Sequence, residues 1–254
     1  MSAHTIPVLK KAIAVLREIA AGGETTAKAM AQQAGVSAST TYRILQTFIA
    51  EDWVRASADG RHELSIGLLP LLKPLRRHEA LIETARPVLE KLAADTGLTA
   101  KLSVRDGDRA LTLVRAESPQ ETSISVRVGA AYHLALGSSG AVLLADLAAK
   151  ERAALLDRAP VACWEHQKPA DVSARIAECR RLGYCGDFGG YRPSVHALSA
   201  PVRNGGAMVA AFTLVGFAQD FEGRRRSSLA KYLLGAAAAC GANLNDHHTF
   251  SKPA

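Results

Sequence analysis

Residues 26–49 of this chain, TAKAMAQQAGVSASTTYRILQTFI, have the spacing of two short helices joined by a tight turn. Gly35 stands where such a turn needs a positive backbone φ, which glycine adopts without steric cost. The small side chain of Ala31 allows the two helices to cross closely, Val36 fills the corner, and Ser37 is placed to cap the second helix. The segment is therefore predicted to form a helix-turn-helix, whose second helix is of the kind that enters the DNA major groove.

The second predicted helix separates apolar from polar side chains. Its inward face consists of Thr41, Ile44, Leu45, Phe48 and Ile49. Its outward face consists of Ser37, Ala38, Ser39, Tyr42, Arg43 and Gln46. Because helix N-termini favour phosphate, we expect Ser39 and Thr40 to contact the DNA backbone. Arg43 has the reach for a guanine edge or a phosphate, and Tyr42 for a sugar or a thymine methyl group.

The flanking segments make this interpretation more specific. A helix with Pro7 in its first turn precedes the motif, and its predicted buried face is Val8, Ala12, Val15, Leu16 and Ile19. Residues 53–55 and 61–64, separated by the turn 57–60, predict a strand-turn-strand wing. Without this order, an ordinary helical hairpin with a solvated face would explain the motif equally well. The expected DNA contacts are Ser37, Ser39, Thr40, Tyr42, Arg43, Arg55, Arg61 and His62.

Composition agrees with a DNA-binding protein but supports it only weakly. The net charge is +7, and residues 1–78 contain ten Lys or Arg against six Asp or Glu. The charged and helically spaced start of the chain is unlike a signal peptide, and no apolar run is long enough to span a membrane. The four cysteines show no close pairing. We therefore expect a reduced, cytoplasmic protein that needs no cofactor.

Residues 67–78 form a connector between residues 1–66, the winged helix-turn-helix domain, and a second domain over residues 79–250. The connector is rich in leucine and contains two prolines, which break or kink helices. Its leucines are too apolar for a free linker: Leu68, Leu69, Leu71, Leu72 and Leu75. We expect them to be buried either against a partner subunit, since such DNA readers act as dimers, or against the second domain.

The second domain reads as an α+β fold. A helix is predicted over 79–96, followed by strands over 99–105, 110–116 and 123–128, with a hairpin turn at 106–108. Helices are predicted over 140–146 and 172–182, two further strands over 194–202 and 208–216, and a closing helix over 223–244. Strands followed by helices, antiparallel strands and a final helix are typical of a small-molecule sensor domain.

At this point the chain resembles the IclR family of bacterial transcriptional regulators. The resemblance covers nearly the whole chain, and the segments that carry it are AKAMAQQAGVSASTTYRILQTF, RHELSIG, ETARPVLEKLAADTG, VGAAYHLALGSSGAVLLA, GYCGDFGGYRPSVHALSAPV and VAAFTLVG. It implies a winged-helix domain followed by a GAF-like effector-binding domain around a six-stranded antiparallel sheet. It also implies a homodimer or dimer of dimers that responds to a small organic acid, often an aromatic one. The helix-turn-helix and the apolar connector further lead us to expect a pseudo-palindromic site on double-stranded DNA.

The resemblance places the effector-binding residues at Ser138, Ser139, Asp187, Val195, Ala197, Thr213 and Val215. Hydroxyls and free amides at a helix N-terminus suit a carboxylate, Thr213 can donate to it, and Asp187 can accept from a ligand hydroxyl. The chain departs from the family pattern at several positions. Ala141 replaces a lysine, Gly190 an acidic residue and Ser194 a glycine, while Thr213 and Val215 replace serines. This less polar pocket favours a bulkier or aromatic acid.

Three alternatives remain open at this point. Cys163, His166, Cys179 and Cys185 could bind a metal, although their spacing is irregular. Ser138 or Ser139 with His133, His196 and Asp187 could form a hydrolase triad, although the G-x-S-x-G motif is absent. The run Arg224–Arg226 could bind phosphate, although a solvated helix start explains it as well. A non-enzymatic regulator without metal accounts for more of the chain than any of these.

Overall fold

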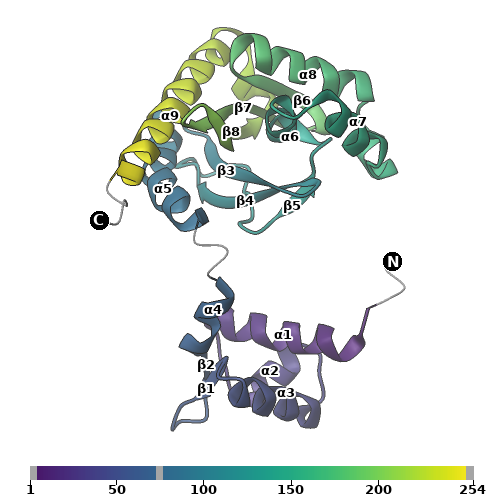
Figure 1. The fold of residues 1–254 in the computed structure, drawn as a ribbon, viewed down its shortest axis with the longest axis vertical. Helices are drawn as coiled ribbons and strands as arrows, with labels where there is room; N and C mark the ends of the chain where they lie inside the picture. Colours follow the sequence, from purple (N-terminus) through teal and green to yellow (C-terminus); the bar gives the residue numbers. More distant parts are fainter. Residues whose placement is uncertain (1–4, 73–76, 250–254) are drawn as a thin grey trace. The chain divides into compact units, whose positions relative to one another are not determined.

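A computed structural model describes residues 5–72 and 77–249 of the chain, and the side chains of residues 5–71 and 78–244. The chain divides into two compact units, residues 1–76 and 77–254 (Figure 1). Each unit has its own hydrophobic core. The described start of the predicted connector, residues 67–72, belongs to the first unit. No helix of the described residues is long and apolar enough to cross a membrane.

The first unit is a winged helix-turn-helix. It contains α1 (Pro7–Ala21), α2 (Ala27–Gln33), α3 (Ala38–Ala50), β1 (Val54–Ala56), β2 (His62–Leu64), a short 3-10 helix η1 (Ile66–Leu68) and α4 (Leu69–Leu72). The predicted turn is present, because Gly35 has a φ of 63°. The Ser37 hydroxyl caps α3 by accepting from the amide of Thr40 at 3.4 Å. The core of this unit consists of Val15, Ile19, Met30, Val36, Ile44, Leu45, Phe48 and Val54.

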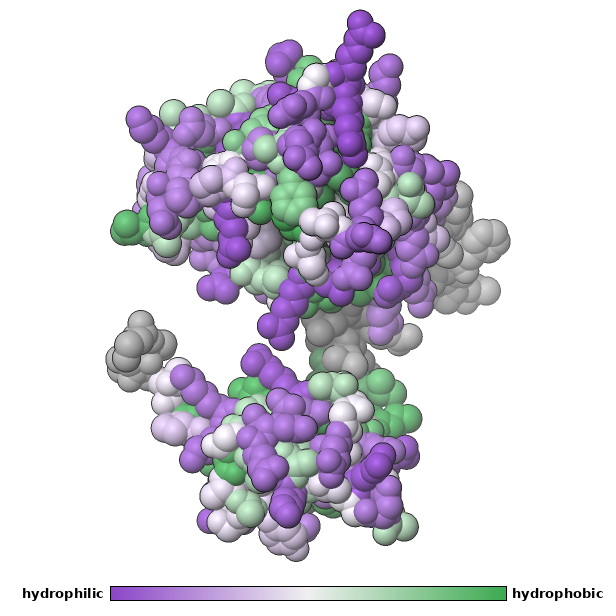
Figure 2. Space-filling model, turned by 180° about the vertical axis from the view of Figure 1, so that it is seen from behind, coloured by the Kyte–Doolittle hydropathy of each residue, from purple (hydrophilic) through white to green (hydrophobic). Residues whose placement is uncertain are grey.

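The leucines around α4 that the structure describes are partly or largely exposed in the single chain. Leu69 and Leu71 are exposed, with 55% and 53% of their surface accessible, and Ile66 just before them is 76% exposed. Figure 2 shows hydrophobic surface on this side of the N-terminal unit. No described part of the chain covers these side chains. The side chains of Leu72 and Leu75 lie outside the described residues, so for them burial stays a prediction.

The second unit is built on a six-stranded antiparallel sheet with the order β5-β4-β3-β8-β7-β6. The strands are β3 (Thr99–Asp106), β4 (Arg109–Ala116), β5 (Ala131–His133), β6 (Cys185–Arg192), β7 (Val195–Asn204) and β8 (Ala207–Phe217). The helices are α5 (Arg77–Thr96), α6 (Gly137–Ala145), α7 (Ala149–Asp157), α8 (Pro169–Leu182) and α9 (Gly223–Thr249), with 3-10 turns η3 (Val161–Trp164) and η4 (Ala218–Phe221).

Helices cover both faces of this sheet (Figure 1). On one face, Leu89 of α5 and Leu233 of α9 share a core with Leu102 and Phe212 of the central strands. On the other face, α6, α7 and α8 form a second core that includes Ala211 of β8. This α+β architecture confirms the predicted fold class. The short α6, buried along nearly its whole length, lies directly over the sheet and can therefore present its N-terminus to a cavity.

One predicted strand is wrong, and one predicted helix begins at a different residue. The segment 123–128 is not a strand, because β5 at Ala131–His133 occupies the edge of β4 instead, with Ala110 opposite Tyr132. The segment is held from the side by Arg115, which donates to the Ser125 hydroxyl at 3.2 Å. The helix predicted at 140–146 starts three residues earlier, at Gly137. Strand β6 was not predicted, because the glycines of CGDFGGYR hide the alternation typical of a strand. Helix α7 was not predicted either.

Candidate functional site

The exposed face of α3 carries the residues expected to contact DNA. Tyr42 is 60% exposed, and Ser39 and Arg43 are exposed beside it. Ser37 and Thr40 are already bonded to each other, since their hydroxyl oxygens lie 2.8 Å apart. Their side chains therefore define the start of the helix, while Tyr42 and Arg43 are the large groups that project from it.

The wing residues are held by partners within the first unit. Arg55 pairs with Glu63 directly across the two strands at 2.8 Å, and Arg61 pairs with Asp59 at 3.3 Å. Both pairs are exposed, so competition from a DNA phosphate can release either arginine. The His62 ring is turned inwards, with Nδ1 at 3.1 Å from the Thr25 carbonyl oxygen. His62 thus ties the wing to the start of α2 and is the least available of the expected DNA contacts.

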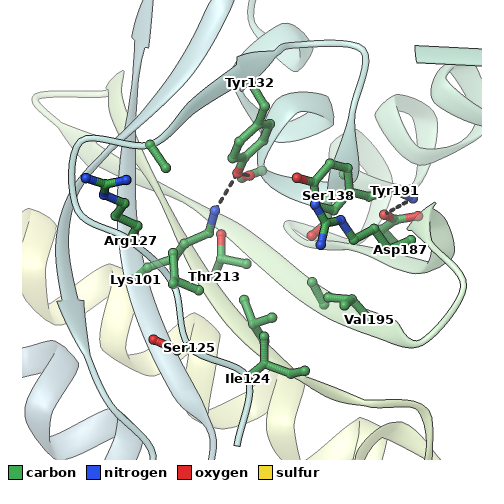
Figure 3. A pocket seen from close by; sticks show the side chains of 17 residues that line it. Lys101, Ile124, Ser125, Arg127, Tyr132, Ser138, Asp187, Tyr191, Val195 and Thr213 are labelled. Atoms are coloured by element: carbon green, nitrogen blue, oxygen red, sulfur yellow. Dashed lines mark hydrogen bonds between the residues drawn. The ribbon is translucent and has the colours of Figure 1, made fainter. Parts of the chain in front are cut away.

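In the second unit, a cavity of about 330 Å³ lies between the sheet, the start of α6 and the segment 124–127. All seven residues expected to bind an effector line it: Ser138, Ser139, Asp187, Val195, Ala197, Thr213 and Val215. Figure 3 shows Ser138 and Asp187 on one side, Thr213 and Val195 on the strands, and Ile124 at the opposite wall. Cavities of this size accommodate small organic ligands.

Buried hydroxyls join α6 to the sheet beneath the cavity. The oxygen of Ser138 lies 2.7 Å from that of Ser199, which lies 2.8 Å from that of Thr213. Ser138 is in the first turn of α6 and does not cap it, because the capping position is Leu136 and no side chain caps the helix. The hydroxyls of Ser138 and Thr213 are therefore partly engaged before any ligand arrives.

Asp187 lines the cavity and already has several partners within the protein. Its carboxylate pairs with Arg175 at 3.0 Å and also accepts from the amides of Gly190 and Tyr191, each at 3.0 Å. Both side chains of the ion pair are buried. A carboxylate has about four acceptor sites, so these three bonds leave one for the ligand hydroxyl expected there. Asp187 also fixes the turn at 189–191 against the cavity, with Tyr191 beside it (Figure 3).

The same network explains the glycine at position 190. A Cβ atom built there would lie 2.6 Å from a carboxylate oxygen of Asp187 and 2.8 Å from a guanidinium nitrogen of Arg175. No side chain fits at Gly190 while that pair is in place. The tight packing of the Asp187–Arg175 pair thus accounts for a glycine, rather than an acidic residue, at position 190.

Two polar residues of the cavity were missed from the sequence. Lys101, on β3, is only 5% exposed, and its ammonium group donates to the hydroxyl of Tyr132 on β5 (Figure 3). The Tyr132 oxygen also lies 2.6 Å from the Ser139 hydroxyl. Burial raises the pKa of Tyr132. The Lys101 ammonium and the hydrogen bonds together lower this pKa by more than burial raises it, so the pKa lies below its ordinary value. The available signal was a lysine within the apolar strand sequence TAKLSV.

The charges that line the cavity favour an anion. Lys101, Arg127 and Arg192 supply cationic groups, and the lining carboxylate is that of Asp187. Because Arg175 neutralises Asp187, this carboxylate does not balance the positive charges of Lys101, Arg127 and Arg192. Among the described residues, no carboxylate forms an ion pair with Lys101. An anionic group of a ligand would provide the missing counter-ion.

The geometry does not favour the alternative sites. Within the described part of the chain, no three His, Cys, Asp or Glu side chains are grouped as a metal site requires, and Cys163, Cys179, Cys185 and Cys240 are free thiols. The two histidines of the alternative hydrolase triad have other partners. His133 Nδ1 accepts from the Ala135 amide, and the His196 ring lies 5.4 Å from the Phe188 ring.

The arginine run at the start of α9 is engaged in surface contacts. Arg225 lies 3.6 Å from Asp220, and Arg226 lies 3.6 Å from Glu178. The Arg226 guanidinium also lies 4.0 Å from the centre of the Phe188 ring. These contacts support a solvated helix start rather than a phosphate site.

Comparison with known proteins covers both units. Residues 8–58 match the IclR helix-turn-helix domain, and residues 75–241 match the family described as bacterial transcriptional regulator IclR C-terminal. The chain is 27% identical to the HTH-type transcriptional regulator RhmR of Escherichia coli K12, over 96% of this chain and 94% of RhmR. It is 26% identical to the acetate operon repressor of Salmonella typhimurium, over 73% of each chain.

Solved structures show the same fold. The IclR protein of Thermotoga maritima superposes with a TM-score of 0.72 at 21% identity, covering 93% of this chain and 98% of that one. An IclR homologue from Microbacterium hydrocarbonoxydans, crystallised with 4-hydroxybenzoate, also has a TM-score of 0.72 at 21% identity, with 94% and 99% covered.

A winged helix-turn-helix joined to an α+β unit with an internal cavity defines a transcription regulator with a DNA-binding domain and an effector domain. The family matches over both units agree with this class. The chain belongs to the IclR family of bacterial transcriptional regulators.

Proposed function

We propose that this regulator binds a pseudo-palindromic operator as a homodimer or dimer of dimers, and that a small organic acid in the cavity changes its affinity for that DNA. The observation that carries the effector proposal is the cavity of about 330 Å³ in which buried Lys101 has no carboxylate partner among the described residues. A carboxylic acid supplies that partner and brings an apolar body to fill the remaining space.

The apolar part of the lining supports an aromatic or comparably bulky acid. Ile124, Val195, Ala197 and Val215 face the cavity, and these side chains form no hydrogen bonds with a small, strongly hydrated keto acid. The Microbacterium hydrocarbonoxydans homologue that was crystallised with 4-hydroxybenzoate supports the same class of ligand. We therefore take 4-hydroxybenzoate and benzoate as the first compounds to test.

The exposed face of α3 supports operator binding, with Arg43 and Tyr42 in position to meet base edges or the sugar-phosphate backbone. The exposed Leu69, Leu71 and Ile66 support self-association, because side chains of this size are seldom left in solvent together. The protein would act without metal or cofactor and without catalysis, in the cytoplasm, where bacterial regulators meet DNA.

One experiment tests the two halves of this proposal separately. The full-length protein selects its binding site from a random duplex library, and the affinity for the selected site is then measured by fluorescence anisotropy with and without each acid. We expect a two-fold symmetric site and a shift in Kd on addition of an aromatic acid. Failure to select any site contradicts the DNA half. If a site is selected but no acid changes the Kd for it, the proposal that an organic acid controls DNA binding is contradicted.

A further inference from the structure

The polar groups of the cavity differ in how much hydrogen-bonding capacity they have left. Ser138 and Thr213 are joined through Ser199, and the Asp187 carboxylate accepts bonds from Arg175 and two backbone amides. These groups correspond to positions that the family resemblance assigns to the ligand. In this chain their main partners are protein atoms.

Among the buried polar groups of the cavity, Lys101 has the largest unused hydrogen-bonding capacity. An ammonium group has three donors, and the hydrogen bonds of Lys101 within the described residues use one of them, towards the Tyr132 hydroxyl. Its nitrogen also lies 4.6 Å from the centre of the Tyr132 ring, on the side of the cavity formed by β3 and β5. A buried ammonium without a counter-ion is unfavourable, so the protein retains this arrangement at a cost that a bound anion would remove.

Tyr132 and Ser139 complete a three-residue cluster around the same point. The Tyr132 hydroxyl lies between Lys101 and Ser139, and all three residues line the cavity. Figure 3 shows the Lys101 and Tyr132 side chains directed towards each other on the side of the cavity away from Asp187. One ammonium and two hydroxyls can together bind both oxygens of a carboxylate.

We infer that the carboxylate of the effector binds to the Lys101–Tyr132–Ser139 cluster, and that its apolar body lies towards Ile124, Val195 and Val215. This inference rests on the proposed function, which supplies the acid but not its orientation. The anchor is therefore a buried cation on the sheet, rather than the Ser138 and Thr213 hydroxyls. The effector must be an ionised acid, since a neutral amide of the same shape cannot neutralise Lys101.

The test measures Kd by isothermal titration of the full-length protein with 4-hydroxybenzoate, benzoate and 4-hydroxybenzamide. We expect the acids to bind and the amide to bind far more weakly. Lys101→Met should raise the Kd of the acids roughly 10- to 100-fold, as loss of a charged hydrogen bond does. Tyr132→Phe should raise it by a smaller factor of roughly 3 to 10, since it removes one neutral partner.

Two further variants make the result specific. Lys91→Met removes an exposed lysine of α5 that pairs with Asp95 outside the cavity, and it should leave the Kd unchanged. Thr213→Val tests the rival anchor, and it should change the Kd less than Lys101→Met does. Thermal melting of each variant confirms folding, and Tyr132→Phe keeps the test valid if Lys101→Met does not fold.

The outcomes distinguish failure of the Lys101–Tyr132–Ser139 anchor from failure of the proposed effector function. Acid binding that survives in Lys101→Met and Tyr132→Phe but is lost in Thr213→Val overturns the anchor and leaves the proposed function standing. Equal binding of 4-hydroxybenzamide and 4-hydroxybenzoate overturns the anchor as well. Absence of binding of either acid to the wild-type protein counts against both the anchor and the aromatic-acid effector.

Discussion

The Arg175 guanidinium of α8 lies 3.0 Å from the Asp187 carboxylate of β6, and both side chains are buried. Arg175 also donates to the Gln167 side chain, and Asp187 accepts from the amides of Gly190 and Tyr191. This ion pair therefore joins a helix on one face of the sheet to the turn that lines the cavity. Its main effect is to fix the shape of that wall.

Removing Arg175 should destabilise the second unit. We expect Arg175→Met to lower the free energy of unfolding by roughly 3–5 kcal/mol, because Asp187 would remain buried without its cation. Urea denaturation measures the change. The matched control is Arg203→Met, which breaks the half-exposed pair with Asp146 and should cost less than about 1 kcal/mol. Equal losses in the two variants would contradict a structural role for the buried pair.

A side chain at position 190 should disturb the same network. Gly190→Ala places a Cβ atom 2.6 Å from Asp187 and should both destabilise the protein and weaken binding of an aromatic acid. Gly235→Ala is the control, because no heavy atom lies within 4 Å of its added Cβ and the position lies within helix α9. Calorimetry should show a lower Tm for the first variant and an unchanged or higher Tm for the second.

The exposed arginine of α3 should contribute to operator recognition. We expect Arg43→Ala to weaken binding to the selected operator by roughly 1–3 kcal/mol. Arg17→Ala, which removes an exposed arginine from α1, provides a control of equal charge change. Fluorescence anisotropy at fixed salt compares the two. Arg43 is not a DNA contact if both variants bind the operator as tightly as the wild type.

Acidic pH should destabilise the protein through His133. Burial is the main cause that lowers the pKa of this imidazole below its ordinary value of 6.5, and Arg109 lowers it further against an opposing effect of Asp108. The unfolded chain therefore takes up a proton more readily than the folded one as the pH falls below 6.5. The free energy of unfolding should decrease from pH 7 to pH 5, and His133→Asn should reduce that decrease in denaturation curves.

Alkaline pH should weaken effector binding. The pKa of Tyr132 is raised by burial but lowered more strongly by Lys101 and its hydrogen bonds, to below its ordinary value of 10.0. Its phenolate would compete with a carboxylate for Lys101, so the Kd of an aromatic acid should rise as the pH approaches that range. Titration calorimetry from pH 7 to pH 9.5 measures this rise, and Tyr132→Phe should remove most of it.

The sequence was sufficient for the parts that depend on local pattern. The turn at Gly35, the cap at Ser37 and the buried face of α3 follow from short-range spacing, and the structure confirms them. The seven residues expected around the effector all line one cavity, although they come from α6, β6, β7 and β8. That outcome depended on the family resemblance, because no local pattern brings these elements together.

The rest depended on tertiary contacts. Nothing local shows that Asp187 meets Arg175, twelve positions away, or that Lys101 of β3 meets Tyr132 of β5 across the intervening strand β4. The segment 123–128 alternates like a strand, yet the neighbouring edge of β4 pairs with residues 131–133. Competition between two segments for one strand edge is decided by the whole sheet, and a window of sequence does not contain that information.

The pairing of β6 with β7 shifts register between Phe188 and Arg192, while β7 pairs with β8 in regular register from Val195 to Val202. The turn between those two residues of β6 thus stands outside the ladder of hydrogen bonds, although it forms part of the cavity wall. Changes in that turn that leave Gly190 and its contacts with Asp187 in place can alter the cavity wall without shifting the central strands. In this fold, the shape of the cavity can therefore vary through one turn while the paired strands keep their register.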